Sequence, residues 1–238
     1  MPPLPLRIRV LIAGGLGVAG VAGLAQVVSS RLPVSAAYPR NAVAVFVMMM
    51  TIAVAVVNEG HPFPRFGPAN QVTMVRAMLV ALLASLVLER LTPGAVWWVI
   101  GATASMAAID GLDGWLARRT RMASAFGARF DTEVDALLIL ILSILVWQYE
   151  KAGAWVLACG LMRYVFVAAG WMLPWLAGPL QPTFRGKVVA VAQFAGLSLA
   201  LAPIVLAPAS DIVAAITLAA LVWSFAIDVR RLWRGDGG

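Results

Sequence analysis

Apolar stretches of about 20 residues recur along the whole chain, and they limit the possible folds more than any other feature. A helix needs about 20 apolar residues to cross the hydrocarbon core of a membrane. Of the 238 residues, 62% are hydrophobic and 12% are charged, with a mean hydropathy of +0.90. Charged residues make up about a quarter of an ordinary soluble domain. Because backbone groups in lipid must be satisfied within helices or closed barrels, these stretches predict an all-α integral membrane protein.

The apolar stretches that are long enough to cross a membrane number eight, at 9–28, 41–58, 70–89, 94–110, 131–149, 152–173, 187–207 and 211–229. Clusters of proline and glycine separate several of them. The first stretch, which follows Arg7 and Arg9, also fits a cleaved signal peptide, although its length favours a retained helix. Its glycines, between Gly14 and Gly23, predict close packing against a neighbouring helix.

Lysine and arginine are distributed unequally between the two ends of these stretches. An even number of spans places both termini on one side, and cytoplasmic loops carry the excess of basic residues. With the N-terminus in the cytoplasm, the inner ends hold Arg7, Arg9, Arg65, Arg118, Arg119, Arg121, Arg129, Arg185, Lys187, Arg230, Arg231 and Arg234. The outer ends hold Arg31, Arg40, Arg90 and Lys151. We therefore expect cytoplasmic termini, as in a bacterial inner membrane protein. The net charge of +7 then indicates contact with anionic membrane lipids, and no nucleic-acid partner is expected.

One polar passage, residues 110–135, interrupts the apolar pattern between the fourth and fifth stretches. Asp110 and Asp113 lie one helical turn apart, and Asp131 and Asp135 are separated by four positions, so each pair shares a helix face. A short connection would bring the four carboxylates together near the cytoplasmic boundary, where such a cluster needs protons or cations. Oxygen ligands suit Mg²⁺ or Mn²⁺, and the sequence offers no Cys/His set for zinc.

Small residues and an arginine accompany these aspartates. Gly111, Gly114 and Ala117 leave the helix surface beside the acids bare, and Gly127 does the same before Asp131. Arg118 can donate several hydrogen bonds to a phosphate. The combination predicts a diphosphate site, in which one carboxylate can deprotonate an attacking group.

The spacing of these residues resembles the signature of the CDP-alcohol phosphotransferase (CDP-alcohol phosphatidyltransferase) family. It reads Asp110-x-x-Asp113-Gly114-x-x-Ala117-Arg118, then eight residues, then Gly127-x-x-x-Asp131-x-x-x-Asp135. The similarity extends more weakly to residues 68–77 and 185–193. The latter segment resembles phosphatidylglycerophosphate-synthase-like members, except that Ala190 replaces a threonine.

The resemblance implies a six-helix catalytic core at 68–238, often assembled as a homodimer, behind an N-terminal region at 1–67 with two extra transmembrane helices. Such enzymes transfer a phosphatidyl group from a CDP-linked lipid donor, such as CDP-diacylglycerol, to an acceptor alcohol and release CMP. It further implies two divalent metal ions on Asp110, Asp113, Asp131 and Asp135, with Asp135 as the general base. The implied CDP contacts are Asp110, Asp113, Gly114, Ala117, Arg118, Gly127, Asn70 and Thr73.

Basic residues inside the apolar stretches bear on the acceptor. Arg76, Arg163, Arg185 and Lys187 could form a pocket for a phosphorylated acceptor such as glycerol 3-phosphate. They could equally extend to lipid headgroups or pair with the aspartates, and pairing is favoured for Arg76. Phosphatidylglycerol, inositol phosphate and serine remain open as acceptors.

Two further interpretations concern the acids and the lone histidine. A cation or proton transporter would also use membrane carboxylates, but it would place them near mid-membrane rather than at one face. His61, in a proline-rich loop, is interpreted as a surface histidine rather than a base.

Overall fold

A computed structural model describes residues 6–57, 61–63, 65–87, 89–120, 122–178 and 183–234. Within the helices, it gives only the backbone for residues 110–114, 116–118 and 177. The predicted all-α fold is confirmed, since each of the eight predicted stretches corresponds to a helix and the described residues include no strand. The helices are α1 (Leu6–Arg31), α2 (Tyr38–Val56), α3 (Pro68–Ala84), α4 (Pro93–Thr120), α5 (Ala125–Gln148), α6 (Leu157–Met172), α7 (Phe184–Leu201) and α8 (Ala209–Arg234). Two short 3₁₀ helices, η2 (Ala154–Val156) and η3 (Pro174–Ala177), flank α6.

Most of these helices have the length and apolarity of membrane spans. Within the described part of the chain, five segments are long and apolar enough to cross a membrane: α1, α2, Ala154–Met172, α7 and α8. Helix α3 and the first part of α4, Pro93–Ile109, are shorter apolar helices. The first half of α5 carries Arg129, Asp131, Glu133 and Asp135, which lowers its hydropathy. The fold is that of a multi-pass membrane protein.

The helices around the polar passage extend further than the sequence predicted. Helix α4 continues to Thr120 instead of ending near 110, and α5 begins at Ala125 instead of 131. Hydropathy marks where apolar surface ends, whereas a helix continues until its backbone is capped. At α5 the cap is Ser124, whose Oγ accepts a hydrogen bond from the Gly127 N–H at 3.1 Å.

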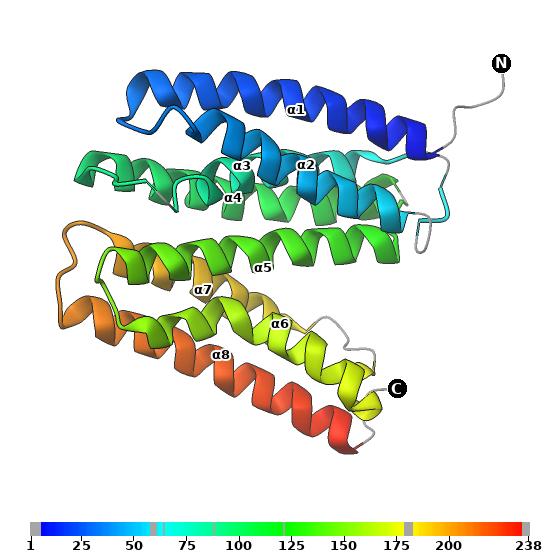
Figure 1. The fold of residues 1–238 in the computed structure, drawn as a ribbon. Coiled ribbons are helices and arrows are strands. Elements are labelled where there is room, and N and C mark those ends of the chain that lie inside the picture. The colour runs from blue at the N-terminus through cyan, green and yellow to red at the C-terminus, as the bar shows by residue number, and fades with distance from the viewer. Residues whose placement is uncertain are drawn as a thin grey trace. The chain divides into compact units, whose positions relative to one another are not determined.

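The chain divides into two compact units, Met1–Leu137 and Leu138–Gly238, which are described separately. In the first unit, α1 pairs with α2, both pack against α3, and α3 packs against α4 (Figure 1). A Cβ on Gly17 would lie 2.5 Å from the ring of Phe46, and one on Gly20 would lie 2.6 Å from the Met78 methyl group. The predicted close packing is therefore confirmed for Gly17 and Gly20, whereas a Cβ on Gly15 or Gly23 would meet no atom within 4 Å.

A tether at one end of the first unit holds the N-terminal helices to α3. The Glu89 carboxylate accepts hydrogen bonds from the Ser35 N–H at 2.9 Å and from the Ser35 hydroxyl at 2.6 Å. The Tyr38 hydroxyl donates to the Leu82 carbonyl at 3.2 Å. The α1–α2 connection is thus bonded to the segment that follows α3.

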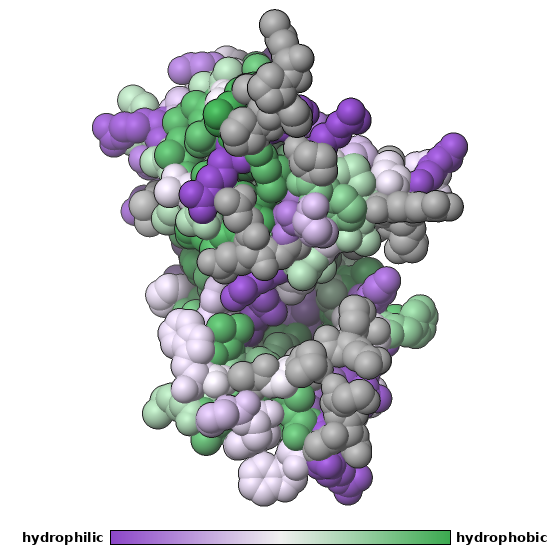
Figure 2. Space-filling view, turned by 90° about the vertical axis from the view of Figure 1, so that its right-hand side faces the viewer, coloured by the Kyte–Doolittle hydropathy of each residue, from purple (hydrophilic) through white to green (hydrophobic). Residues whose placement is uncertain are grey.

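At the opposite end of the first unit, the α2–α3 and α4–α5 connections meet through His61 and Ser124. Figure 2 looks at the side on which α1 begins, where hydrophilic residues lie among hydrophobic ones. Helix α3 starts at this end, immediately after Gly67, whose φ of +82° is a conformation that glycine adopts without strain.

In the second unit, α7 pairs with α8. The buried Gln193 side chain donates to the Thr217 carbonyl at 2.8 Å, and Gly160 lets α6 approach the backbone of Leu140. Lys151 donates to the carbonyls of Ala202 and Val205, at 3.1 and 2.6 Å, beyond the end of α7. The predicted domain boundary at 67/68 concerns the extent of a catalytic core, so this packing division leaves it a prediction.

Candidate active site

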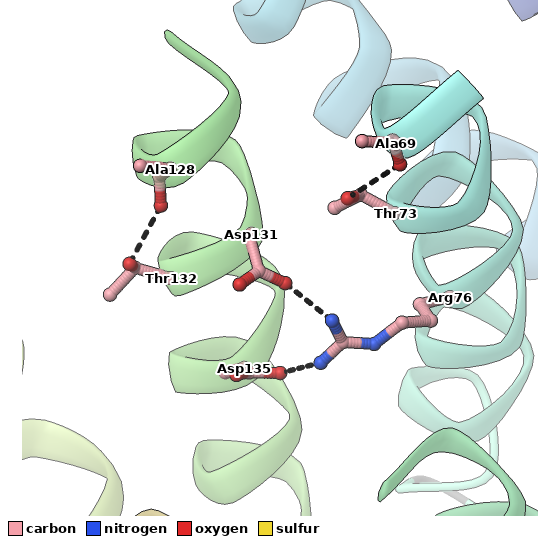
Figure 3. A network of polar contacts seen from close by, with 7 residues as sticks. All are labelled: Ala69, Thr73, Arg76, Ala128, Asp131, Thr132 and Asp135. Atoms are coloured by element: carbon pink, nitrogen blue, oxygen red, sulfur yellow. Dashed lines mark hydrogen bonds and ion pairs between the residues drawn. The ribbon is translucent and has the colours of Figure 1, made fainter. Parts of the chain in front are cut away.

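Two of the four signature aspartates share one buried arginine. Arg76 of α3 donates from Nη1 to Asp131 Oδ1 and from Nη2 to Asp135 Oδ1, both on α5 (Figure 3). The Arg76 side chain is 1% exposed, whereas those of Asp131 and Asp135 are 32% and 20% exposed. The predicted sharing of one helix face is therefore confirmed for Asp131 and Asp135, and Arg76 forms the pairing that its sequence favoured.

The charges of this cluster do not cancel. One guanidinium offsets one of the two carboxylate charges, so Arg76, Asp131 and Asp135 together carry a formal charge of about −1. A buried guanidinium is stable only when such partners satisfy it, and its planar fork can bind two separate carboxylates. Both aspartates stay partly exposed, so a ligand can reach their carboxylates.

The residues of this cluster fit a hard divalent cation. Carboxylate oxygens are the ligands that Mg²⁺ and Mn²⁺ prefer, and the four-residue spacing on α5 turns two carboxylates to one side. Asp110 and Asp113, with Gly114, Ala117 and Arg118, lie on the α4 backbone, but their side chains lie outside the described residues. Among the described side chains, no group of three or more acids, histidines or cysteines forms, and two of the predicted ligands are not in that set.

The predicted CDP-binding residues of α3 and α5 lie together next to this cluster. Buried Asn70 donates from Nδ2 to the Phe66 carbonyl at 2.6 Å. Its Oδ1 lies only 2.6 Å from the position that a Cβ on Gly127 would occupy. Thr73, one turn before Arg76, donates to the Ala69 carbonyl at 3.2 Å on the side of α3 that faces α5 in Figure 3. Helices α3 and α5 therefore approach closely here, and only glycine fits at position 127.

The interpretation of His61 as a surface histidine is wrong. His61 is 6% exposed, its Nδ1 lies 2.9 Å from Ser124 Oγ, and its Nε2 lies 2.7 Å from the Arg65 carbonyl. The rings of Phe63 and Phe126 pack edge-on against it. The aromatic residues of the surrounding loop were the available signal, because they can bury a histidine that a proline-rich loop alone would expose.

The remaining predicted acceptor residues belong to the second unit. Arg185 pairs with Asp228 of α8, and both side chains are largely buried. Thr183 caps α7 by accepting from the Gly186 N–H at 3.1 Å. Lys187 is exposed and Arg163 is half-buried. The sequence did not predict a role for Asp228, because it lies in the polar last turns of α8, where an acid near several arginines is typical of the protein surface.

Comparison with protein families shows to which family the chain belongs. The family model for CDP-alcohol phosphatidyltransferases matches residues 66–226, which is more than half of the chain. The protein belongs to the CDP-alcohol phosphatidyltransferase family. Comparison with curated proteins and with solved structures gives no match. As a CDP-alcohol phosphatidyltransferase, the protein is a transferase that moves a phosphatidyl group from a CDP-alcohol donor to an alcohol acceptor in a membrane. The matched residues include Arg76, Asp131 and Asp135, and they begin shortly after His61.

Proposed function

We propose that this CDP-alcohol phosphatidyltransferase transfers the phosphatidyl group of a CDP-linked lipid, such as CDP-diacylglycerol, to glycerol 3-phosphate and releases CMP. The observation that carries the proposal is the pair of signature carboxylates, Asp131 and Asp135, held on one face of α5 by buried Arg76. This arrangement supports a diphosphate site because it fixes carboxylate oxygens, the ligands that Mg²⁺ and Mn²⁺ prefer, on one face of α5.

Two Mg²⁺ or Mn²⁺ ions would be held by Asp110, Asp113, Asp131 and Asp135. When bound, the ions would supply positive charge to the diphosphate and to the departing CMP. Gly114, Ala117, Arg118, Gly127, Asn70 and Thr73 would contact the CDP part of the donor. The close approach of Asn70 to Gly127 supports this role, since it places two of the proposed contacts side by side on α3 and α5.

Asp135 would act as the general base. Its carboxylate would accept the proton of the acceptor hydroxyl while the hydroxyl oxygen bonds to the phosphorus that carries the lipid. The bond from that phosphorus to the bridging oxygen would break, and its electron pair would leave with CMP. Arg76 supports this step by fixing the Asp135 carboxylate in one orientation.

An anionic acceptor would suit the basic residues of α6 and α7. Arg185, held by Asp228 at the capped start of α7, would bind the acceptor phosphate with Arg163 and Lys187. Arg76 would contribute mainly by holding the aspartates. Phosphatidylglycerol, inositol phosphate and serine are the alternative acceptors for the same chemistry.

The excess of basic residues near one end of the predicted spans supports a cytoplasmic active site and cytoplasmic termini in a bacterial inner membrane. The family resemblance also favours a homodimer. We therefore propose this location and a homodimeric enzyme together with the reaction.

The acceptor is tested with purified protein, CDP-diacylglycerol and Mn²⁺, incubated with each acceptor in turn, and the lipid product is identified by its mass. We expect the phosphatidyl ester of glycerol 3-phosphate, and a weaker yield from Arg185→Gln. A product formed only from another acceptor would overturn the choice of glycerol 3-phosphate. If no acceptor releases CMP, the proposed function itself fails.

A further inference from the structure

A chain of hydrogen bonds joins the only histidine of the protein to the start of α5. His61 lies in the α2–α3 connection, ahead of the residues that match the family. It is buried, and both of its ring nitrogens have a polar neighbour: the Arg65 carbonyl at 2.7 Å and the Ser124 hydroxyl at 2.9 Å. Ser124 in turn accepts from the Gly127 N–H at 3.1 Å.

The Arg65 carbonyl fixes the direction of its own bond to His61 and, for a neutral ring, the direction of the bond to Ser124. A carbonyl can only accept, so the Nε2 of His61 must carry the proton that it donates to Arg65. In the neutral ring, Nδ1 is then an acceptor, and it receives the hydroxyl proton of Ser124. The Ser124 oxygen keeps a lone pair for the Gly127 N–H. One tautomer of His61 therefore satisfies all three bonds.

Aromatic packing holds the imidazole in this position. The ring centroid of Phe126 lies 5.8 Å from that of His61, and Phe63 lies 5.5 Å away on an edge-on contact. Phe126 also stacks on Phe130, one turn further along α5, with centroids 5.8 Å apart. These contacts bind the α2–α3 connection to the first turns of α5.

The chain of hydrogen bonds ends on Gly127, whose position is tightly restricted. Gly127 faces Asn70 so closely that a Cβ would clash with the Asn70 side chain. Asp131 and Asp135 follow Gly127 by about one and two helical turns. A small shift at the start of α5 would therefore change the distance between Gly127 and Asn70, even if the fold stayed the same.

We propose that His61 is a positioning residue for the donor site, which acts through Ser124 to set Gly127 against Asn70. The inference rests on the proposed function, which assigns Gly127 and Asn70 to the CDP moiety. With His61, the residues that shape the donor site include one from the α2–α3 connection, which lies before the matched family region.

Substitutions of His61 separate positioning from plain stability. His61→Ala should raise the KM for CDP-diacylglycerol by about tenfold while kcat changes less than about twofold, as expected when the hydrogen bond that leads to Gly127 through Ser124 is lost. His61→Asn places an amide oxygen near the former Nδ1 and should restore most of the donor KM. His61→Gln keeps a donor toward Arg65 but not the bond to Ser124, so it should restore little.

A second helix cap in the same unit provides the matched control. Thr92 Oγ1 accepts from the Ala95 N–H at 3.3 Å at the start of α4, as Ser124 does at α5. Ser124→Ala should raise the donor KM as His61→Ala does, whereas Thr92→Ala should leave it unchanged. If both cap variants, or His61→Asn and His61→Gln alike, lower thermal stability with an unchanged donor KM, the positioning role is overturned.

A spectroscopic measurement tests the chain without any turnover. Because the protein has one histidine, ¹⁵N-histidine labelling with a histidine-free affinity tag gives a single pair of ring-nitrogen signals. We expect a protonated Nε2 and an unprotonated, hydrogen-bonded Nδ1, and Ser124→Ala should move the Nδ1 signal. A protonated Nδ1 tautomer, or no response to Ser124→Ala, would overturn the inference. Wild-type protein that shows the expected tautomer but releases no CMP would instead overturn the proposed function.

Discussion

Arg76 is a buried cation, and the two charged partners that the structure describes for it are both predicted metal ligands. It therefore contributes to the fold and to the site by the same two contacts. Removing one partner from a buried ion pair leaves an uncompensated charge and costs about 3–5 kcal/mol. Since the carboxylates would also lose their fixed orientation, a change at Arg76 should affect turnover as well as stability.

Arg76→Met should lower kcat by at least about 100-fold and reduce the free energy of unfolding by about 3–5 kcal/mol. Arg76→Lys should retain part of the activity, because one ammonium can hold one carboxylate but cannot bridge both as a guanidinium does. Steady-state kinetics and thermal unfolding in detergent measure the two effects. Arg40→Gln, at an exposed arginine near the start of α2, is the control. Wild-type kcat in Arg76→Met would contradict the role of the pair.

Among single residues, the shared helix face of Asp131 and Asp135 was predicted correctly, and the burial of His61 was not. Asp131 and Asp135 could be found because a spacing of four fixes their common direction on any helix. The pairing of Arg76 was also predictable, since a guanidinium inside an apolar helix needs an acidic partner. The burial of His61 depends largely on contacts with residues about 63 positions away, and the aromatic residues of its own loop are only a weak local signal for it.

Helix α5 is the element on which the site is built, and its distance from α3 is set at Gly127. The nearest atoms to an added Cβ are Asn70 Oδ1 at 2.6 Å and Ser124 Oγ at 3.2 Å. Asn70 is buried and bonded to Phe66, so it cannot turn away at low cost. A side chain at 127 must therefore displace the Asn70 side chain or push α3 and α5 apart.

Gly127→Ala should raise the donor KM by about tenfold or more, which corresponds to about 1.4 kcal/mol. The matched control is Gly101→Ala on α4, where an added Cβ meets no atom within 4 Å. That control should leave the KM unchanged and stabilise the helix by up to about 1 kcal/mol. Equal KM values for the two variants would contradict a close approach at Gly127.

The ends of α4 and α5 show what hydropathy cannot predict. The sequence placed the helix ends where the apolar residues stop, at 110 and 131. The helices continue to Thr120 and begin at Ala125, because glycine, alanine and arginine can continue a helix whatever their polarity and because Ser124 caps α5. The number and order of the helices were predictable, whereas their ends depend on caps that contribute only about 1 kcal/mol each.

On the scale of the whole molecule, the two N-terminal helices pack against a helix of the matched family region. Helices α1 and α2 both pack against α3, and Glu89 and Tyr38 bond the α1–α2 connection to the end of α3. The N-terminal helices are therefore packed onto the helix that carries Arg76.

Glu89→Gln should loosen this attachment without altering the site, because the tether lies at the opposite end of the first unit from His61 and Ser124. The amide has one oxygen for the two Ser35 donors, and hydrogen bonds to a charged group contribute about 1.5–3 kcal/mol. We expect a lower unfolding temperature and faster proteolysis within 32–37, with an unchanged donor KM. Ser30→Ala, which removes a bond within α1 only, serves as the control. Equal proteolysis rates in both variants would contradict the tether.

The most direct test of the central claim is divalent-metal-dependent release of CMP from CDP-diacylglycerol by the purified protein, compared with Asp135→Asn. The substitution keeps the size of the side chain but removes the carboxylate that we assign as general base. The account predicts CMP release by the wild-type protein with Mg²⁺ or Mn²⁺, none after chelation, and a fall of at least about 1000-fold in Asp135→Asn. CMP release by Asp135→Asn at the wild-type rate, or by the wild-type protein after chelation, would contradict it.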